Sequence, residues 1–236
     1  MEEEFHTEKH SFTKTKLFYC PIYKIKIDPN LYDKEQIIND ITYNKSLKNT
    51  RNDTQYNFGN CDIHHSYNDH DNVNFRTINY EKLIDVYLKI FKEFFEKEIY
   101  TKKPFNYKFK ILNYSAITEG QWLPSHNHLG TGDDFATVHY LNFKKDHIPT
   151  SFWNPAIFTQ YLKHLRPEFV DILDNMATDN SYFWQYFDVP VEEDDMLIFP
   201  AVLDHEIPAQ GPTKESRITI SSNIWAIKRK TQWELR

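Results

Sequence analysis

Apolar and polar positions divide the chain into a helical first part and a strand-rich second part. Apolar residues recur every three or four positions over residues 33–44 and, more regularly, over 79–100, and this spacing predicts two amphipathic helices. Asp33 suits the N-cap position of the first helix. A short strand is expected at 22–27, before both helices, and the polar stretch 45–75 is expected to be irregular.

After Pro104 the period of the pattern changes to two, which is typical of strands. Helical spacing returns once, at 158–177, within an insertion at about 158–181. Helices followed by mainly antiparallel strands predict a mainly β (α+β) fold in one domain, with 1–104 as a helical support region and 105–236 as a core closed as a sandwich or barrel. The expected strands are 107–115, 121–124, 135–143, 182–189, 196–199 and 217–227.

Charge and composition exclude several classes of function. The net charge of −6 argues against nucleic acid as a partner, and no glycine-rich phosphate loop occurs. No apolar run reaches the roughly 18 residues that a membrane helix needs, so no membrane segment is expected. Cys20 and Cys61 are too few for a disulfide framework and indicate free thiols in a reducing, cytoplasmic compartment. The basic residues Lys228, Arg229 and Lys230 are interpreted as a solvated end.

A pair of histidines in the strand-rich part carries the clearest chemical signal. Alternate residues of a strand face the same side, so His126 and His128 are expected to point together and to hold one metal ion. Among 11 histidines such a pair also arises by chance. A third ligand must come from another strand, and His205, which follows an apolar strand, fits that role. Arg217 lies in the next alternating strand, where an inward-facing guanidinium requires a carboxylate partner.

This order of elements and residues resembles that of the double-stranded β-helix oxygenases that use iron and 2-oxoglutarate. The segment 196–225 carries the resemblance to their C-terminal half. The whole chain is also similar to a small family of 2-oxoglutarate–Fe(II) oxygenases from phages and bacteria that have a His-x-His motif. That likeness extends over the motif residues Leu17, Phe18, Pro21, Ile22, Trp122, His126, His128, Tyr140, Leu141, Asn154 and Pro155.

The resemblance implies a double-stranded β-helix (jelly-roll, cupin-like) core with N-terminal helices. It implies a hydroxylase that uses Fe(II), 2-oxoglutarate as co-substrate and O2, and that acts on a small molecule or a protein side chain. Its phage relatives imply a virus-encoded enzyme acting in the host cytoplasm. The metal ligands would be His126, His128 and His205. The co-substrate residues would be Arg217, which binds the distal carboxylate, Thr219, Asn113, Tyr114 and Asn223, with Trp225 beside them; core packing is the alternative for Tyr114, Asn223 and Trp225.

One departure from the wider superfamily concerns the metal ligands. No His-x-Asp occurs, and His128 stands where the carboxylate ligand is usual. Three neutral ligands can hold Fe(II) when 2-oxoglutarate supplies the negative charge. Asp133 or Asp134, in the loop after His128, is the alternative anionic ligand. The only His-x-Glu begins at His6 in the polar N-terminal tail and is expected to be exposed.

Two other functions remain open from the sequence. A three-histidine, cupin-like dioxygenase would work without 2-oxoglutarate, and a non-enzymatic β-sandwich binding or virion protein would carry the histidines incidentally. The second group of histidines, His64, His65 and His70, lies in the polar stretch and is expected to form a solvated loop, which suits a lid. His139 is expected to be a core or strand-face histidine.

Overall fold

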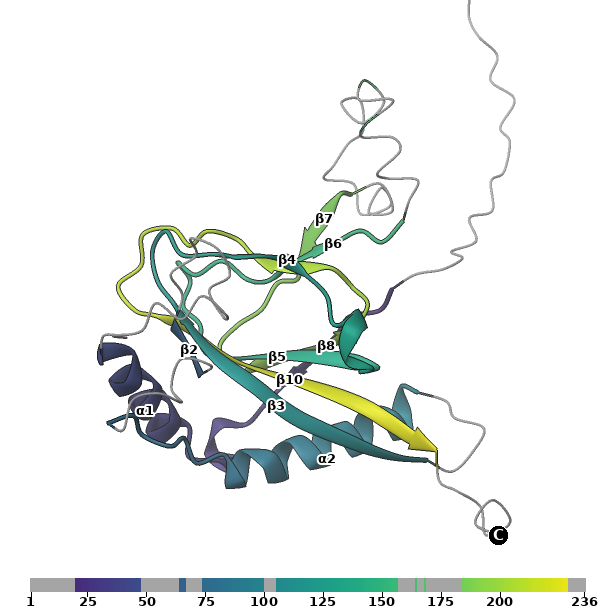
Figure 1. The fold of residues 1–236 in the computed structure, drawn as a ribbon, viewed down its shortest axis with the longest axis horizontal. Coiled ribbons are helices and arrows are strands. Elements are labelled where there is room, and N and C mark those ends of the chain that lie inside the picture. The colour runs from purple at the N-terminus through teal and green to yellow at the C-terminus, as the bar shows by residue number, and fades with distance from the viewer. Residues whose placement is uncertain are drawn as a thin grey trace, which may run out of the picture.

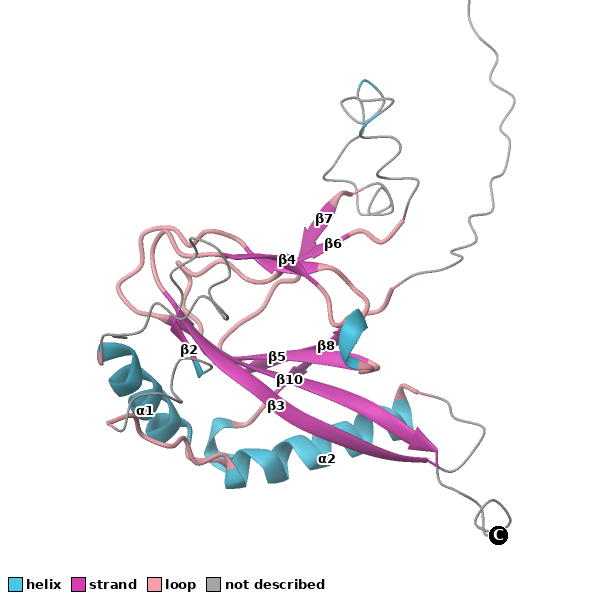
Figure 2. Cartoon of the chain, viewed as in Figure 1, coloured by secondary structure: helices cyan, strands magenta, loops and turns pink. Residues whose placement is uncertain are grey.

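Two antiparallel β-sheets face each other, and the helices cover the outer side of the larger sheet (Figure 1). The computed structural model describes residues 20–47, 64–66, 74–99, 105–156, 164, 168 and 184–228. Figure 2 shows strands as the main element of this part of the chain, with the helices gathered on one side. The mainly β fold expected from the period-two pattern is therefore confirmed.

The order of the strands defines the fold as a double-stranded β-helix, or jelly roll. The larger sheet has the order β1-β8-β5-β10-β3-β2 and the smaller sheet the order β4-β9-β6-β7. The eight strands from β3 to β10 form the core. β3, β10, β5 and β8 lie in the larger sheet, and β4, β9, β6 and β7 make up the smaller one, so successive strands of the chain alternate between sheets as in a jelly roll, except at β6 and β7. The strands are β1 (Tyr23–Lys26), β2 (His64–His65), β3 (Phe105–Ile117), β4 (Leu123–His126), β5 (Phe135–Asn142), β6 (Ser151–Trp153), β7 (Tyr186–Asp188), β8 (Asp195–Pro200), β9 (His205–Ile207) and β10 (Arg217–Lys228).

Two α-helices, α1 (Lys34–Ser46) and α2 (Glu81–Lys97), confirm the amphipathic spacing of the sequence. The apolar stripe of α2 packs on the larger sheet because its buried residues recur at three- and four-residue steps. Asp33 stands at the N-cap of α1, but its side chain makes no capping hydrogen bond and pairs with Lys82 Nζ at 2.7 Å instead. Among the described helices, none combines the length and the apolar character needed to cross a lipid bilayer.

The larger sheet has two different faces because successive side chains of a strand point to opposite sides. On β10, Ile218, Ile220 and Ile224 face the helices and join their apolar core. The opposite face turns toward the smaller sheet, and here Tyr140 and Phe199 pack against Phe152 of β6. We call this second side the inner face of the larger sheet.

The structure corrects several details of the predicted elements. His64 and His65 were expected in an irregular stretch, but they form β2 and pair with Ala116 and Ser115 of β3. β1 confirms the strand expected at 22–27, and together with β2 it extends the larger sheet, so the region 1–104 is more than a helical support. β6 and β9 were not predicted, because three residues show no measurable period. Most of the insertion at 158–181 lies outside the described residues, as do Cys61, His70 and the tail that contains His6.

Candidate metal centre

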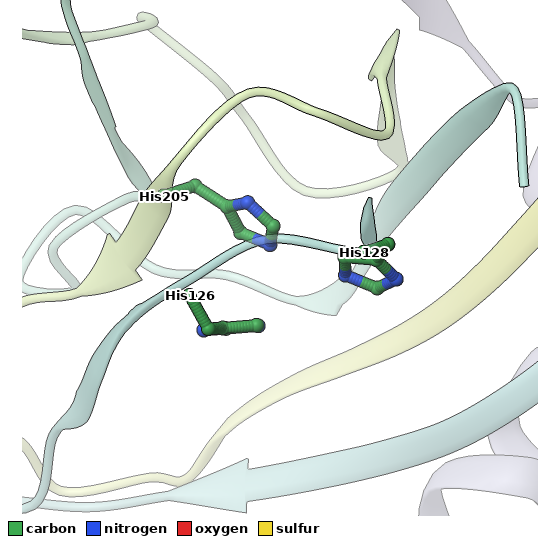
Figure 3. A group of neighbouring side chains, drawn as sticks. All are labelled: His126, His128 and His205. Carbon is green, nitrogen blue, oxygen red and sulfur yellow. The ribbon is translucent and has the colours of Figure 1, made fainter. Parts of the chain in front are cut away.

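Three histidines from two segments distant in sequence bring their rings together (Figure 3). His126 ends β4 and His205 begins β9, and the two are directly opposite in the antiparallel ladder. Their ring centroids are 4.3 Å apart, and that of His128 lies 5.4 Å from His205 and 5.7 Å from His126. One ring nitrogen from each histidine lies within 4.8 Å of the others, a spacing that could hold a metal ion.

His128 lies outside the strand that was expected to position it. β4 ends at His126, and His128, with φ −112° and ψ 25°, is the residue that precedes the 3-10 helix Leu129–Thr131. The argument from strand alternation is therefore wrong for His128. Its backbone N–H donates to Ala201 O at 2.8 Å, in the turn that leads to β9. A tertiary hydrogen bond thus holds His128 close to the segment that carries His205.

Local hydrogen bonds fix the tautomers of two of the histidines. His126 Nδ1 lies 2.9 Å from Pro124 O, and His205 Nδ1 lies 2.9 Å from Leu203 O. A carbonyl oxygen only accepts hydrogen bonds, so each Nδ1 carries the proton and each Nε2 keeps its lone pair. Both rings therefore offer Nε2 as a metal ligand.

Burial keeps the imidazoles of His128 and His205 in the neutral form that binds metal. It lowers the pKa of His205 to about 3, with a further contribution from nearby His126. The pKa of His128 is lowered by burial and by His126, while Asp133 and Asn223 act in the opposite direction. A neutral imidazole keeps the lone pair that a cation needs.

Arg217 on the inner face is the largest fully buried side chain of the described residues. Its Nε donates to Ile148 O and its Nη2 to Thr150 Oγ1, both at 3.1 Å. Its Nη1 is buried and has no partner in the described part of the chain. Burial lowers the pKa of the guanidinium, as expected for a cation removed from water without a counter-ion. This donor set suits an incoming carboxylate.

Glu215, the acidic residue two positions before Arg217, does not pair with it in the structure. Its Oε2 accepts a hydrogen bond from Asn142 Nδ2 at 3.2 Å, and none of the ion pairs of the described residues joins a carboxylate to Arg217. Within the described part of the chain, the charge of Arg217 is therefore met only by neutral groups.

Tyr140 and Thr150 hold the Arg217 side chain, and neither role was predicted from the sequence. The guanidinium carbon lies 5.1 Å from the Tyr140 ring centroid. Tyr140 Oη donates to Thr150 Oγ1 at 3.0 Å and accepts from Thr150 N at 3.1 Å. Strand alternation from Ala136 could have placed Tyr140 on the inner face. Thr150 lies in a loop, where no periodic pattern in the sequence indicates which way a side chain points.

The inner face also connects Arg217 with the histidines. Tyr140 belongs to the same apolar cluster as Phe152 and Phe199. The rings of these two phenylalanines lie 6.0 and 4.8 Å from that of His205. The arginine and the three-histidine group therefore border one continuous packed region between the two sheets.

The remaining candidate residues divide between the two faces. Thr219 shares the face of Arg217, and its Oγ1 lies 2.9 Å from Ser115 Oγ. Asn223 lies on the same face, where its Nδ2 donates to Asp133 and its Oδ1 is buried without a partner in the described residues. Asn113 is half-buried and points to the same side of β3 as Ser115. Their contact with a co-substrate stays a prediction.

Tyr114 requires a correction. Adjacent residues of β3 point to opposite sides, so Asn113 and Tyr114 cannot both line the inner face. The Tyr114 hydroxyl lies 3.1 Å from His64 Nε2 and 3.5 Å from Asn44 Nδ2, among the residues that contact the helices. Tyr114 is therefore a core residue.

Neither aspartate of the loop after His128 belongs to the ligand group of the described residues. Asp134 Oδ2 accepts a hydrogen bond from Ala226 N at 2.6 Å, and Asp133 accepts one from the Asn223 side chain. His139 is a core histidine, as expected, with Nδ1 2.8 Å from the Tyr87 hydroxyl.

Comparisons with known proteins give matches among solved structures alone. No family model and no curated protein matches the chain. A prolyl hydroxylase from Trichoplax adhaerens, in complex with a hypoxia inducible factor peptide fragment, shares 8% identity over 86% of this chain and 83% of that chain, with a TM-score of 0.48. A viral collagen prolyl hydroxylase from Paramecium Bursaria Chlorella virus-1, in complex with 2OG, shares 12% identity over 86% and 94% of the two chains, with a TM-score of 0.46.

A third similar structure is an oxidoreductase of the 2OG-Fe(II) oxygenase family from Burkholderia pseudomallei, with 9% identity and a TM-score of 0.42. The match covers 66% of this chain and 64% of that protein, so the chain spans less than two thirds of its length. At these identities the likeness concerns the fold, which the strand order defines independently.

Proposed function

We propose that the protein is a non-haem Fe(II)- and 2-oxoglutarate-dependent dioxygenase that hydroxylates its substrate. Within that class we propose the His-x-His type of phages and bacteria, because three histidines and no carboxylate form the ligand group in the described residues. The observation that carries the proposal is the fully buried Arg217, whose Nη1 has no partner among the described residues, on the sheet face that borders the three histidines.

The residues fit the proposed metal and co-substrate. His126 and His205 offer Nε2 lone pairs fixed by main-chain carbonyls, and His128 completes a group of three neutral ligands. Bound iron would supply the capacity to activate O2 with electrons from the oxidative decarboxylation of 2-oxoglutarate. The two carboxylates of the co-substrate would offset the charges of the metal and of Arg217, for which the described residues provide no counter-ion.

Arg217 is expected to bind the distal carboxylate of 2-oxoglutarate through Nη1. Its other nitrogens are already bonded to Ile148 O and Thr150 Oγ1, so the guanidinium is held in one orientation before the ligand arrives. Preorganisation of this kind lowers the entropic cost of binding. Thr219, next on the same face, would add a hydroxyl donor, and Asn113 and Asn223 are the further candidates.

Turnover of 2-oxoglutarate tests the proposed function. The purified protein with Fe(II) and O2 is expected to form succinate, and His205→Ala is expected to abolish this reaction. In parallel, 2-oxoglutarate is expected to raise the melting temperature in the presence of a redox-inert divalent metal. Metal binding without any effect of 2-oxoglutarate would favour a cupin-like dioxygenase, and absence of both would contradict an enzymatic role for the histidines.

A further inference from the structure

Two loops meet beside Arg217. The first, residues 143–150 between β5 and β6, carries Ile148 O and Thr150 Oγ1, which accept the hydrogen bonds of the guanidinium. We call it the acceptor loop. The second, the β9–β10 loop of residues 208–216, ends directly before Arg217. The orientation of the guanidinium therefore depends on how firmly the two loops are joined, because one leads to the arginine and the other carries its acceptors.

His147 joins the acceptor loop to the β9–β10 loop. It is 5% exposed, and its Nε2 lies 3.1 Å from Glu215 O and 3.0 Å from Thr213 Oγ1. Its Nδ1 accepts a hydrogen bond from Lys144 N at 2.9 Å within the acceptor loop. A ring nitrogen that accepts carries no proton, and a carbonyl oxygen only accepts. The imidazole is therefore neutral, and Nε2 is the donor to Glu215 O.

The contacts of His147 and Arg217 close a small ring. From Glu215 the chain runs through two peptide bonds to Arg217. Arg217 Nε then donates to Ile148 O at 3.1 Å, and Ile148 directly follows His147 in the chain. The hydrogen bond from His147 Nε2 to Glu215 O completes the ring. Loss of that bond would open the ring and leave the guanidinium less firmly oriented.

Two further buried side chains support this arrangement from its edges. Gln210 Oε1 accepts from Ile148 N at 2.9 Å, but Gln210 lies near the start of the β9–β10 loop. Asn142 Nδ2 donates to Ser216 O at 2.9 Å, but Asn142 belongs to β5 and not to the acceptor loop. His147, in contrast, connects the neighbour of an Arg217 acceptor with the residue two positions before Arg217.

We propose that His147 is a positioning residue for the co-substrate. It holds Arg217 in the orientation in which Nη1, which has no partner among the described residues, binds the distal carboxylate. This inference rests on the proposed function, because it gives Arg217 that ligand. A donor that is held in one direction before binding loses less conformational entropy when the ligand arrives. Since His147 acts through Arg217, its effect is expected only on ligands that carry a distal carboxylate.

Two substitutions at one position test the proposal. In His147→Gln the side-chain amide nitrogen can take the place of Nε2 and donate to Glu215 O, whereas the shorter amide of His147→Asn can replace only Nδ1 as the acceptor for Lys144 N. Both variants lose the imidazole and one of its contacts, but only His147→Asn loses the link to the β9–β10 loop. Calorimetric titration of the Mn(II)-loaded proteins with 2-oxoglutarate measures the affinity of each.

The two variants are expected to differ in affinity for 2-oxoglutarate. His147→Asn is expected to weaken binding about tenfold, an effect at the upper end for one hydrogen bond, because preorganisation of the guanidinium is also lost. His147→Gln is expected to stay within about twofold of the wild type, since it keeps the link to Glu215 O. Oxalate is the matched ligand control, because it chelates a metal and has no distal carboxylate. Its affinity is expected to be equal in all three proteins.

The outcomes separate the inference from the proposed function. Equal affinities for 2-oxoglutarate in His147→Asn and His147→Gln would overturn the positioning role. A parallel loss of oxalate affinity in His147→Asn would also overturn it, since the whole site would then have loosened. Failure of the wild type to bind 2-oxoglutarate while it binds Mn(II) would instead contradict the proposed function itself.

Thr213→Val decides the question if His147→Asn does not fold. Thr213 is half-buried, and its hydroxyl contacts His147 Nε2 and donates to Glu215 O at 2.8 Å. Its loss is expected to weaken 2-oxoglutarate binding about threefold and to leave oxalate binding unchanged. An unchanged ratio of the two affinities in this variant would overturn the proposal.

Discussion

The outward and inward faces of the larger sheet are built from the same strands and differ in how their polar groups are satisfied. On β10, Ile218 and Ile220 pack among the rings of the helix layer, whereas Arg217 and Thr219 point toward the smaller sheet. On the helix side, the buried hydroxyls of Thr137 and Ser222 pair with each other at 2.8 Å. On the inner face a guanidinium nitrogen remains without a partner in the described residues. His139 Nε2 on the helix side is also buried without a partner in the described residues, but this imidazole is neutral, whereas the guanidinium of the inner face carries a charge that suits an anionic ligand.

Two buried histidines, one on each face, illustrate this difference. The pKa of His139 on the helix side and that of His205 on the inner face are both lowered to about 3 by burial. His139 is bonded to the Tyr87 hydroxyl and packed against aromatic rings, while His205 lies beside two further histidines. A depressed pKa therefore identifies burial, and the neighbouring groups distinguish a core histidine from a metal ligand.

The largest expected effect on stability comes from the helix side. Phe91 is fully buried, and its ring lies 5.3 Å from that of Phe109. Phe91→Ala is expected to lower the free energy of unfolding by about 3–5 kcal/mol, since it leaves a cavity in the core. Urea unfolding measures this loss. Co(II) affinity below the unfolding midpoint is expected to stay near that of the wild type, and a parallel loss of affinity would show that the two faces are not independent.

Arg217→Met is expected to weaken ligand binding without lowering stability, the opposite of Phe91→Ala. Replacing an unpaired buried cation by an apolar side chain of similar length is expected to leave stability unchanged or improved. Affinity for 2-oxoglutarate is expected to fall on the order of 100-fold, or roughly 3 kcal/mol, because the buried charge pair is lost. Calorimetric titration in the presence of Mn(II) measures the affinity. The exposed Arg76→Met serves as control, and equal affinity in both variants would remove Arg217 from the site.

Acid sensitivity is expected to depend on the helix side through His139. The folded-state pKa of His139 is about 3, below the ordinary value of 6.5, so between these pH values only the unfolded chain binds this proton. Stability is thus present above pH 6.5 and falls by about 1.4 kcal/mol per pH unit for each such histidine as the pH drops.

His139→Gln is expected to remove the contribution of one proton, about 1.4 kcal/mol per pH unit, from the slope of the unfolding free energy against pH. Glutamine keeps an acceptor for the Tyr87 hydroxyl but does not titrate. Urea unfolding of the metal-free protein at pH 7, 6 and 5 gives the slope for both proteins. Parallel stability curves would contradict the assigned pKa of His139.

Thr219→Val gives the smallest expected effect and sharpens the comparison within one strand. The substitution removes the hydroxyl bonded to Ser115 Oγ and leaves the shape of the side chain nearly unchanged. It is expected to weaken 2-oxoglutarate binding about fivefold, corresponding to about 1 kcal/mol for one hydrogen bond. The calorimetric titration used for Arg217 measures this change. An affinity equal to that of the wild type would remove Thr219 from the co-substrate site.

Long periodic segments made the fold predictable. The apolar stripe of α2 and the alternation of β5 and β10 extend over enough residues to show their period. β2, β6 and β9 have two or three residues each, and their pairing is decided by partners far away in the chain. Such strands cannot be predicted from local sequence.

The candidate site was predictable in its residue types more than in its geometry. His126 and His205 are opposite each other because β4 and β9 pair, whereas His128 depends on a hydrogen bond to Ala201 O. Alternation fixes which residues of a strand share a face but not which face is inward, so the sequence could not decide between the co-substrate site and core packing for Tyr114, which lies in the core. Thr150 and the link from Asp133 to Asn223 arise from tertiary contacts that leave no periodic signal.

The most direct test of the account is an anaerobic titration of the Fe(II)-loaded protein with 2-oxoglutarate, followed by visible absorption. We predict a weak charge-transfer band that saturates with 2-oxoglutarate in the wild type, is absent in His205→Ala, and needs a far higher concentration in Arg217→Met. A wild-type protein that binds Fe(II) but shows no band at saturating 2-oxoglutarate would contradict the central claim that the three histidines and Arg217 form one site.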